Sequence, residues 1–371
     1  MSLGLFTATA ASAQSPTIFL ARPGTVTTLI DLNADGDFLD FAETQPYAAA
    51  MPAQLGAIAV SPTRVFVIDA TTGTILALAD TNDDHDALDF GEVSLFGIPP
   101  SGPPVLAGLI SISDELCFSV NTTSGNLIRF EDLNHDGDAL DFAEAAIVAN
   151  GLAPAATLAA RPDGVILAAQ SLTTFPVLIL QDRTNDADYL DFAESLSYVE
   201  NTTSGTGLVA VTNQLAYLAR PTDGRVMKLH DLTGDDDALD FAEVTTWADA
   251  VPNVSRLALE PSGALLAACA DPAGSVYRLR DANNDGDALD FGEAIIVATG
   301  QTTPSGIAIR LNTNCLAGDM NADGIVDIVD APLLAAELLN PGSAPTCRAD
   351  VNGDSSTDGR DIRAFTQILL P

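Results

Sequence analysis

The chain has 371 residues, of which 47% are hydrophobic, so it is long enough to bury a substantial core. Its formal net charge is −36, from 51 Asp and Glu against 15 Lys and Arg. This charge argues against nucleic acid and anionic membrane surfaces as partners and favours cations. Acidic chains are often disordered, but here the mean hydropathy is +0.22. We therefore expect the acid to be concentrated in particular segments of a folded protein.

The first residues have features of a secretory signal. A short apolar stretch ends in Ala11-Ser12-Ala13, a pattern typical of signal cleavage after Ala13. The basic region that usually precedes such a stretch is missing. Residues 1–14 are therefore either a truncated signal peptide, which we favour, or an ordinary apolar N-terminus. We expect no membrane span, because no apolar stretch approaches the roughly 18 residues that one requires.

A thirteen-residue acidic segment then recurs six times, at steps of 49, 52, 50, 49 and 50 residues. We call the copies loop 1 (31–43), loop 2 (80–92), loop 3 (132–144), loop 4 (182–194), loop 5 (231–243) and loop 6 (281–293). A period of this size is typical of a propeller blade or a solenoid turn. Three short apolar runs precede each copy and one follows it, which predicts four strands per unit. In the second unit we expect strands near residues 55–60, 64–69, 74–80 and 92–97.

The ends of the repeat region distinguish a closed ring from an open solenoid. The first unit has only three expected strands, near residues 17–21, 25–31 and 43–49. Its missing first strand matches residues 305–311, which follow the last loop. Such a late strand leaves no open sheet edge between the first and last units. We therefore predict an all-β fold over residues 15–312, a six-bladed β-propeller closed by a late strand, and the blades resemble propellers with NHL-like repeats.

Each loop carries oxygen ligands in the spacing of a calcium site. Side-chain oxygens fall at positions 1, 3, 5 and 7, with Asp at position 10 and Glu at position 13. Calcium takes six to eight such ligands at about 2.3–2.6 Å, and the lack of Cys and of regular His argues against zinc or copper. The alternative is that Asp, Asn and Gly merely form good turns, but at least five acids per copy would then repel one another. We predict about six calcium ions in the propeller.

The predicted propeller ligands are Asp31, Asn33, Asp35, Asp37, Asp40, Glu43, Asp80, Asn82, Asp84, Asp86, Asp89, Glu92, Asp132, Asn134, Asp136, Asp138, Asp141, Glu144, Asp182, Asp186, Asp188, Asp191, Glu194, Asp231, Asp235, Asp237, Asp240, Glu243, Asp281, Asn283, Asp285, Asp287, Asp290 and Glu293. The first half of each loop resembles an EF-hand loop. The last acid stands at position 13 instead of 12, so we expect a strand to follow where an EF-hand has a helix.

Differences among the copies lead to further expectations. Loops 4 and 5 have Thr at position 3 and no Gly at position 6, so they should bind calcium more weakly. We expect Leu at position 9 and Phe at position 11, such as Leu39 and Phe41, to anchor the loop on the blade. The Asp at position 10 either caps the loop or binds the metal, and the sequence leaves both roles open.

The pattern changes after the closing strand to two acidic loops, each followed by an apolar helical stretch. The predicted calcium ligands are Asp319, Asn321, Asp323, Asp327 and Asp330, and then Asp350, Asn352, Asp354, Asp358 and Asp361. This resembles a dockerin over residues 315–371, which implies a small α-helical module with about two calcium ions that docks onto a cohesin-like domain. Ser355 replaces the usual Gly, and positions 10 and 11 lack the usual Ser-Thr pairs. Another surface protein is therefore an alternative partner.

The four cysteines fall into two pairs. Cys315 and Cys347 stand four and three residues before the first Asp of the two C-terminal loops, which suggests a disulfide; two free buried thiols are the alternative. Cys117 and Cys269 lie in second strands of different blades, so we expect two separate core residues. The eight acidic loops together hold 40 of the 51 Asp and Glu residues, so most of the acid is predicted to be ligand.

The inner strands, which would line the central channel, contain almost no residue able to act as a base, nucleophile or metal ligand. Arg256, Glu260 and Arg310 are the only charges near them, and the sequence leaves open whether they belong to the channel or to its rim. We therefore expect a secreted, extracellular or cell-surface, non-catalytic protein for binding, adhesion or scaffolding, whose further ligand is a glycan or a second copy. One alternative is a subunit of a calcium-dependent surface assembly. Another is a calcium-dependent hydrolase or lyase acting on a glycan, lactone or phosphate ester.

Overall fold

The computed structural model describes residues 16–310, apart from 34, 83, 101–104, 153–154, 171–176, 192–193 and 201–204; in the C-terminal part it describes 318, 320, 326, 328, 330–339, 349, 351 and 358–369. Thr17–Arg310 form one compact unit, and the described residues from 318 onward belong to a second. The predicted signal over residues 1–14, the domain limits at 15, 312 and 315, and Cys315 and Cys347 lie outside the described residues.

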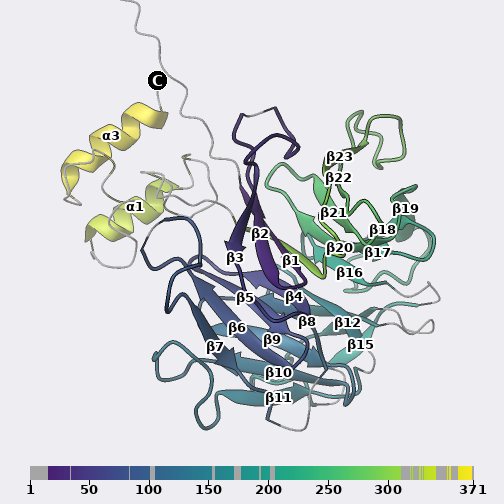
Figure 1. Ribbon diagram of the computed structural model, residues 1–371, viewed down its shortest axis with the longest axis horizontal. Helices are drawn as coiled ribbons and strands as arrows, with labels where there is room; N and C mark the ends of the chain where they lie inside the picture. The colour runs from purple at the N-terminus through teal and green to yellow at the C-terminus, as the bar shows by residue number, and fades with distance from the viewer. Residues whose placement is uncertain are drawn as a thin grey trace, which may run out of the picture. The chain divides into compact units, whose positions relative to one another are not determined.

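The large unit consists of six four-stranded antiparallel sheets, the blades (Figure 1). Blade 1 contains β24 (Gly306–Arg310), β1 (Thr17–Arg22), β2 (Thr25–Leu29) and β3 (Thr44–Ala48), and blade 2 contains β4 (Leu55–Val60), β5 (Arg64–Asp69), β6 (Thr74–Ala79) and β7 (Val93–Gly97). Blade 3 contains β8 (Leu106–Ser111), β9 (Leu116–Asn121), β10 (Asn126–Glu131) and β11 (Ala145–Ala149). Blade 4 contains β12 (Ala155–Ala160), β13 (Ile166–Gln170), β14 (Val177–Leu180) and β15 (Ser195–Val199). Blade 5 contains β16 (Gly207–Ala210), β17 (Leu215–Arg220), β18 (Arg225–His230) and β19 (Val244–Ala248), and blade 6 contains β20 (Val254–Leu259), β21 (Leu265–Cys269), β22 (Val276–Leu279) and β23 (Ala294–Ala298).

The ring closes through the late strand that the sequence predicts. Strand β24 pairs antiparallel with β1, with Ile309 opposite Ile18, and so supplies the first strand of blade 1. The inner strands contact one another in the order β24, β4, β8, β12, β16, β20 and back to β24. The all-β, six-bladed architecture is confirmed.

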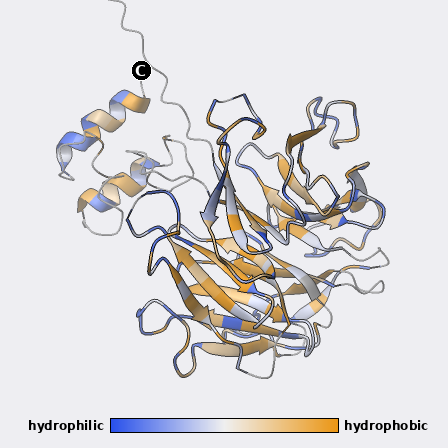
Figure 2. Cartoon of the chain, in the orientation of Figure 1, coloured by the Kyte–Doolittle hydropathy of each residue, from blue (hydrophilic) through white to orange (hydrophobic). Residues whose placement is uncertain are grey.

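Blade faces pack against neighbouring blades, which explains why the middle strands are apolar on both sides. In β5 every residue after Arg64 is buried, whereas the outer strand β7 begins with the exposed Val93 and ends buried at Gly97. Phe66 and Phe96 meet edge to face within blade 2, with ring centroids 4.7 Å apart. Apolar residues accordingly follow the strands and polar residues the loops (Figure 2). Strands buried on both faces lose simple alternation, because both sets of side chains enter a core.

The second unit has two described helices, α1 (Asp330–Leu339) and α3 (Gly359–Leu369). Its core contains Met320, Leu334, Ala349 and Phe365. Across the described parts of the chain, every helix is too short or too polar to cross a bilayer.

Replacing Phe66 by Ala should destabilise the propeller strongly. The side chain is fully buried and its removal leaves a cavity against Phe96, so the expected cost is about 3–5 kcal/mol in urea unfolding. The control is Phe90→Ala in the same blade, whose side chain is fully exposed and should cost less than about 0.5 kcal/mol. Equal losses in the two variants would contradict this assignment of the core.

Candidate metal centres

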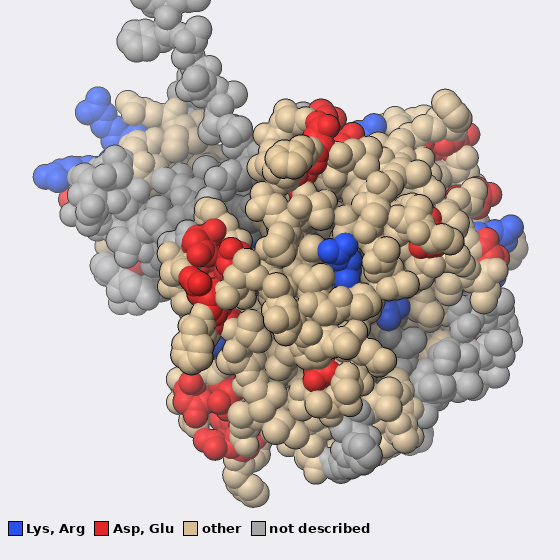
Figure 3. All heavy atoms as spheres, viewed as in Figure 1, with Lys and Arg blue, Asp and Glu red and all other residues tan. Residues whose placement is uncertain are grey.

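Every acidic loop joins the third strand of a blade to the fourth, and a strand follows it, as predicted. The acidic side chains visible on one face of the molecule form separate clusters and do not spread evenly (Figure 3). Position 6 has a left-handed backbone in all six loops: φ is 91° at Gly36, 72° at His85, 104° at Gly137, 67° at Ala187, 70° at Asp236 and 101° at Gly286. Gly adopts this conformation without strain, whereas His85, Ala187 and Asp236 adopt it at some cost.

Main-chain N–H groups fix the carboxylates at positions 1 and 7. In loop 6, Asp281 Oδ2 accepts a hydrogen bond from Gly286 N at 2.9 Å, and Asp287 Oδ1 accepts one from Leu289 N at 3.0 Å. The same two bonds recur in loop 1, at Gly36 and Leu39. Acids that accept local N–H groups in this way form a tight turn, and their oxygens keep further lone pairs that can bind a cation.

The Glu at position 13 is almost completely buried in every copy. Its two oxygens accept main-chain N–H groups from positions 2 and 10: Glu43 receives Leu32 N at 3.0 Å and Asp40 N at 3.1 Å. These buried residues are Glu43, Glu92, Glu144, Glu194, Glu243 and Glu293. Position 13 thus ties the two ends of the loop together.

The surroundings shift the pKa values of several loop acids in opposite directions. The Thr81 N–H holds the pKa of Glu92 below its ordinary value, against the opposing effect of burial. Burial raises the pKa of Asp138, and the carboxylates of Asp136, Glu144 and Asp141 raise it further. In loop 3, burial is thus the larger cause of the raised pKa of Asp138, and repulsion from the neighbouring carboxylates adds to it.

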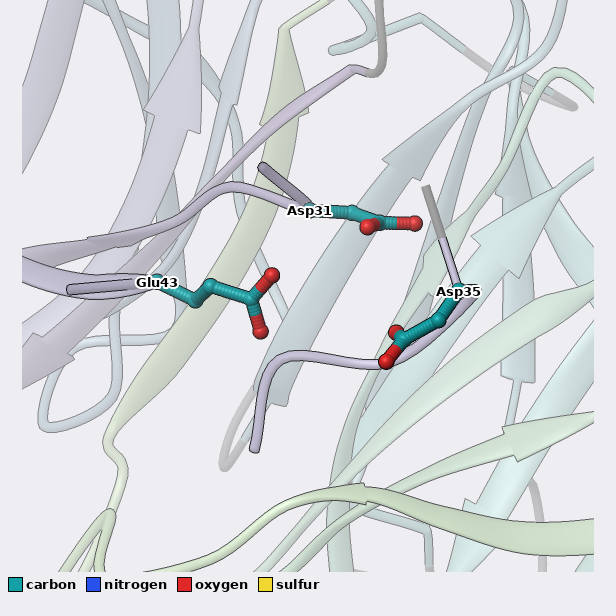
Figure 4. Close-up of side chains that lie close together, drawn as sticks. All are labelled: Asp31, Asp35 and Glu43. Carbon is teal, nitrogen blue, oxygen red and sulfur yellow. The ribbon is translucent and has the colours of Figure 1, made fainter. Parts of the chain in front are cut away.

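Carboxylates from distant loop positions converge on a common space. In loop 1, one oxygen each from Asp31, Asp35 and Glu43 lies within 4.8 Å of the other two (Figure 4). Oδ1 of Asp31 is buried there and has no hydrogen-bond partner. The corresponding acids of loops 2 and 4 reach the same spacing, and those of loops 3, 5 and 6 do not. An all-oxygen set with an unsatisfied buried oxygen fits a hard cation such as calcium.

The Asp at position 10 contacts the amide at position 3. Asn33 Nδ2 donates to Asp40 Oδ2 at 2.6 Å, and the same bond occurs in loops 2, 3 and 6 at 2.6–2.7 Å. In loops 4 and 5 the position 3 hydroxyls of Thr184 and Thr233 donate to the position 13 Glu instead. Asp40 therefore orients Asn33 in this structure, and its direct binding of metal stays a prediction.

The expectation that Leu and Phe anchor the loops is wrong. Phe41, Phe90, Phe142, Phe241 and Phe291 are 99–108% exposed, and the position 9 Leu residues are 41–51% exposed. Position 12 has positive φ in each of these five loops, for example 72° at Ala42. This turn separates Phe41, which points to solvent, from Glu43, which is buried.

Position 8 anchors the loop instead, and the sequence analysis missed it. Its main-chain N–H donates to a carbonyl in the outer strand of the preceding blade in all six copies. The bonds are Phe38 to Val297 at 2.7 Å, Ala87 to Tyr47 at 2.7 Å, Ala139 to Phe96 at 2.7 Å, Tyr189 to Val148 at 2.6 Å, Ala238 to Tyr198 at 2.8 Å and Ala288 to Trp247 at 2.6 Å. In the sequence, position 8 is marked only by a small or aromatic residue before the position 9 Leu. Such a residue does not indicate that its main chain bonds to the preceding blade.

In the second unit, Asp330 and Asp361 are completely buried at the starts of their helices. Asp330 Oδ1 accepts Met320 N at 2.8 Å, and Asp361 Oδ2 accepts Asp358 N at 2.8 Å. The other predicted ligands, Asp319, Asn321, Asp323, Asp327, Asp350, Asn352 and Asp354, lie outside the described residues. In the propeller, Cys117 and Cys269 are free thiols, buried in the cores of separate blades.

The centre of the ring is narrow. A Cβ added to Gly306 would lie 2.8 Å from Ile58 N, so these inner strands approach closely. A cavity of about 100 Å³ is lined by all six inner strands. Arg256 lines it and is not a rim group: its guanidinium donates to the carbonyls of Thr206, Ser255 and Ser305, each at 2.8 Å. Burial lowers its pKa.

The other two charges near the inner strands face away from this cavity. Glu260 forms an ion pair with Arg278 at 2.8 Å, and the guanidinium of Arg310 lies over the ring of Phe19, 4.8 Å from its centroid. Neither residue lines the central cavity. Both residues instead contact a side chain from another strand of their own blade.

Glu92→Gln should lower the melting temperature of the metal-free protein at pH 7. The two oxygens of the ionised carboxylate accept hydrogen bonds from Thr81 N at 2.9 Å and Asp89 N at 3.0 Å. Gln has only one oxygen, which is uncharged, and its NH2 group cannot accept the second bond. Because the folded pKa of Glu92 is lowered, its stabilisation is complete above the unfolded value of about 4.3 and is lost as pH falls through the folded pKa.

Melting in chelator between pH 7 and pH 3 measures this effect, with the exposed Glu200→Gln as control. The gap between wild type and Glu92→Gln should narrow at acid pH. A gap of constant size would mean that the variant acts through shape and not through charge.

Comparisons with known proteins agree with this architecture. Residues 317–370 match the family described as Dockerin type I domain, whose members bind cohesin domains and calcium. No curated protein sequence is detectably similar to the chain. A chain of a nidogen/laminin complex has the same fold, with a TM-score of 0.57 at 14% identity over 80% of this chain and 98% of that chain. A catalytically inactive virginiamycin B lyase from Staphylococcus aureus aligns with a TM-score of 0.47 at 11% identity, over 82% of this chain and 94% of that chain. The chain therefore consists of a six-bladed β-propeller followed by a dockerin type I domain.

Proposed function

We propose that this protein is an extracellular, calcium-stabilised and non-catalytic propeller for binding, adhesion or scaffolding, attached to a cohesin-bearing partner through its dockerin domain. The observation that carries the proposal is the convergence of Asp31, Asp35 and Glu43 within 4.8 Å, in a loop that is repeated in every blade. The dockerin domain supports attachment. The signal-like residues 1–14 support secretion.

Charge repulsion is the physical reason for assigning calcium to the propeller loops. Unit charges at about 4 Å repel by about 1 kcal/mol even in bulk water, and more near a protein surface. Each loop holds five or six acids within thirteen residues. A divalent cation bound between these carboxylates replaces their repulsion with attraction. About six ions in the propeller and two in the dockerin domain would offset a little under half of the net charge of −36.

The centre of the ring supports a non-catalytic role. Its cavity is small, and its charged lining residue, Arg256, already donates to three carbonyls. The loop acids belong to the outer half of each blade, on the connection between its third and fourth strands. A hydrolase or lyase would need acids or bases to meet at one substrate-sized pocket.

A calcium-dependent surface assembly is a second candidate, and the exposed Phe residues favour it. Five loops present a fully exposed Phe beside their carboxylates. Exposed aromatic residues are enriched where protein surfaces meet. In this case the propeller itself would bind neighbouring copies once calcium has neutralised the loops.

Removing one loop site should lower the thermal stability of the calcium-loaded protein and leave that of the metal-free protein unchanged or higher. The variant Asp132→Asn/Asp136→Asn in loop 3 tests this, because calcium binding stabilises only the folded state. Its control, Glu200→Asn/Asp249→Asn, removes two exposed acids outside the loops. Equal melting shifts for both variants in calcium would refute a site in loop 3.

Size-exclusion chromatography in calcium and then in chelator separates the two candidate functions. A surface assembly predicts a larger species that forms only in calcium and that Phe142→Ser/Phe241→Ser reduces. A monomer under both conditions would eliminate the assembly and leave the scaffolding protein.

A further inference from the structure

Five of the six blades place a cation on the loop of the next blade. The target is position 6, at the centre of the acidic loop. The contacts are Arg64 Nη1 to Gly137 O at 3.0 Å, Arg129 Nη1 to Ala187 O at 3.3 Å, Lys228 Nζ to Gly286 O at 3.2 Å, Arg161 Nη2 to Asp236 Oδ1 at 3.2 Å, and Arg278 Nη1 to Gly36 O. Among the described residues loop 2 is the exception, since His85 at its position 6 receives no such contact.

Three of these cations share one position of the repeat. Arg129, Lys228 and Arg278 each lie in a third strand, three residues before the first Asp of their own loop. Arg64 lies in a second strand, and Arg161 directly follows a first strand. Side chains from different chain positions nevertheless reach the same residue of the next loop. Copying of the repeat accounts for the three cations at the shared position but not for Arg64 or Arg161, so contact with position 6 is what the five seams have in common.

The contact fixes the turn residue from outside the loop. In loop 6, Gly286 N–H donates to Asp281 Oδ2 inside the loop, and Gly286 O accepts from Lys228 of the preceding blade. Two residues later, Ala288 N–H donates to Trp247 O of the same preceding blade. The peptide between the acids at positions 5 and 7 is thus held by its own loop and by its neighbour.

We propose that these interblade cations are positioning residues for the calcium sites, and that the five blades that carry them thereby set the calcium affinity of the loop of the next blade. The inference rests on the proposed calcium binding of the propeller. A loop whose turn is already fixed loses less conformational freedom when the metal binds, so its affinity is higher. Simple electrostatics predicts the opposite sign, because a nearby cation repels calcium.

Lys228 gives the clearest test, since Gly286 O is its hydrogen-bond partner and its ammonium group is exposed. Arg225 is the matched control: it lies in the same strand, β18, is 48% exposed, and faces Asp223, not the loop. Trp247, the single tryptophan of the chain, lies against loop 6 through Ala288. It can sensitise the luminescence of terbium, a hard cation that replaces calcium at oxygen sites.

The experiment titrates terbium into the full chain, follows luminescence excited through Trp247, and then displaces terbium with calcium. The proteins are wild type, Lys228→Met, Lys228→Arg, Arg225→Met and the loop 6 variant Asp281→Ala/Asp285→Ala. We expect Lys228→Met to weaken binding about three- to tenfold. Lys228→Arg should restore it, and Arg225→Met should leave it unchanged or slightly tighter.

The outcomes separate this inference from the function on which it rests. If wild type gives no calcium-displaceable signal, or if Asp281→Ala/Asp285→Ala keeps it, loop 6 is not a calcium site and both fail. If wild type binds but Lys228→Met behaves like Arg225→Met, or binds more tightly, only the positioning role is wrong. Melting in chelator is the second readout: both Lys228→Met and Arg225→Met should remain folded at the titration temperature, so that weaker terbium binding by Lys228→Met reports on the site and not on unfolding.

Discussion

Mutual repulsion among the acids of each loop is the constraint on which the rest of the structure depends. Five or six carboxylates share a turn of thirteen residues, and their positions are fixed by main-chain N–H groups that point inward. The left-handed residue at position 6 and the buried Glu at position 13 bring the two halves of the loop together. A loop of this kind is stable only if something outside the carboxylates compensates their charge.

The neighbouring blade supplies part of that compensation through cations such as Lys228 and Arg64, and it also holds each loop in place. The position 8 N–H bonds to the preceding outer strand in all six blades, including the seam where Phe38 of blade 1 meets Val297 of blade 6. The strand β24 closes the sheet at one end of the chain, and these loop contacts close the seams around the whole ring. The stability of each loop is therefore coupled to the closure of the ring, because a loop that unfolds also loses its hydrogen bond to the preceding blade.

The repeat period predicted the features that depend on local pattern. The number of blades, the late closing strand, the place of each loop and the strand after Glu43 all follow from spacing and turn residues. The sequence did not predict that Phe41 points to solvent. Its direction depends on the positive φ of Ala42, a conformation that Ala rarely adopts. The cations were missed because they meet the loops only across a seam between blades, although Arg129, Lys228 and Arg278 recur at one position of the repeat.

Calcium binding to the purified full chain, measured by isothermal titration calorimetry after complete chelation, decides whether the propeller loops bind metal. We expect six to eight bound ions per chain, of which about two belong to the dockerin domain. A stoichiometry of two would assign calcium to the dockerin domain alone and contradict calcium binding by the propeller loops.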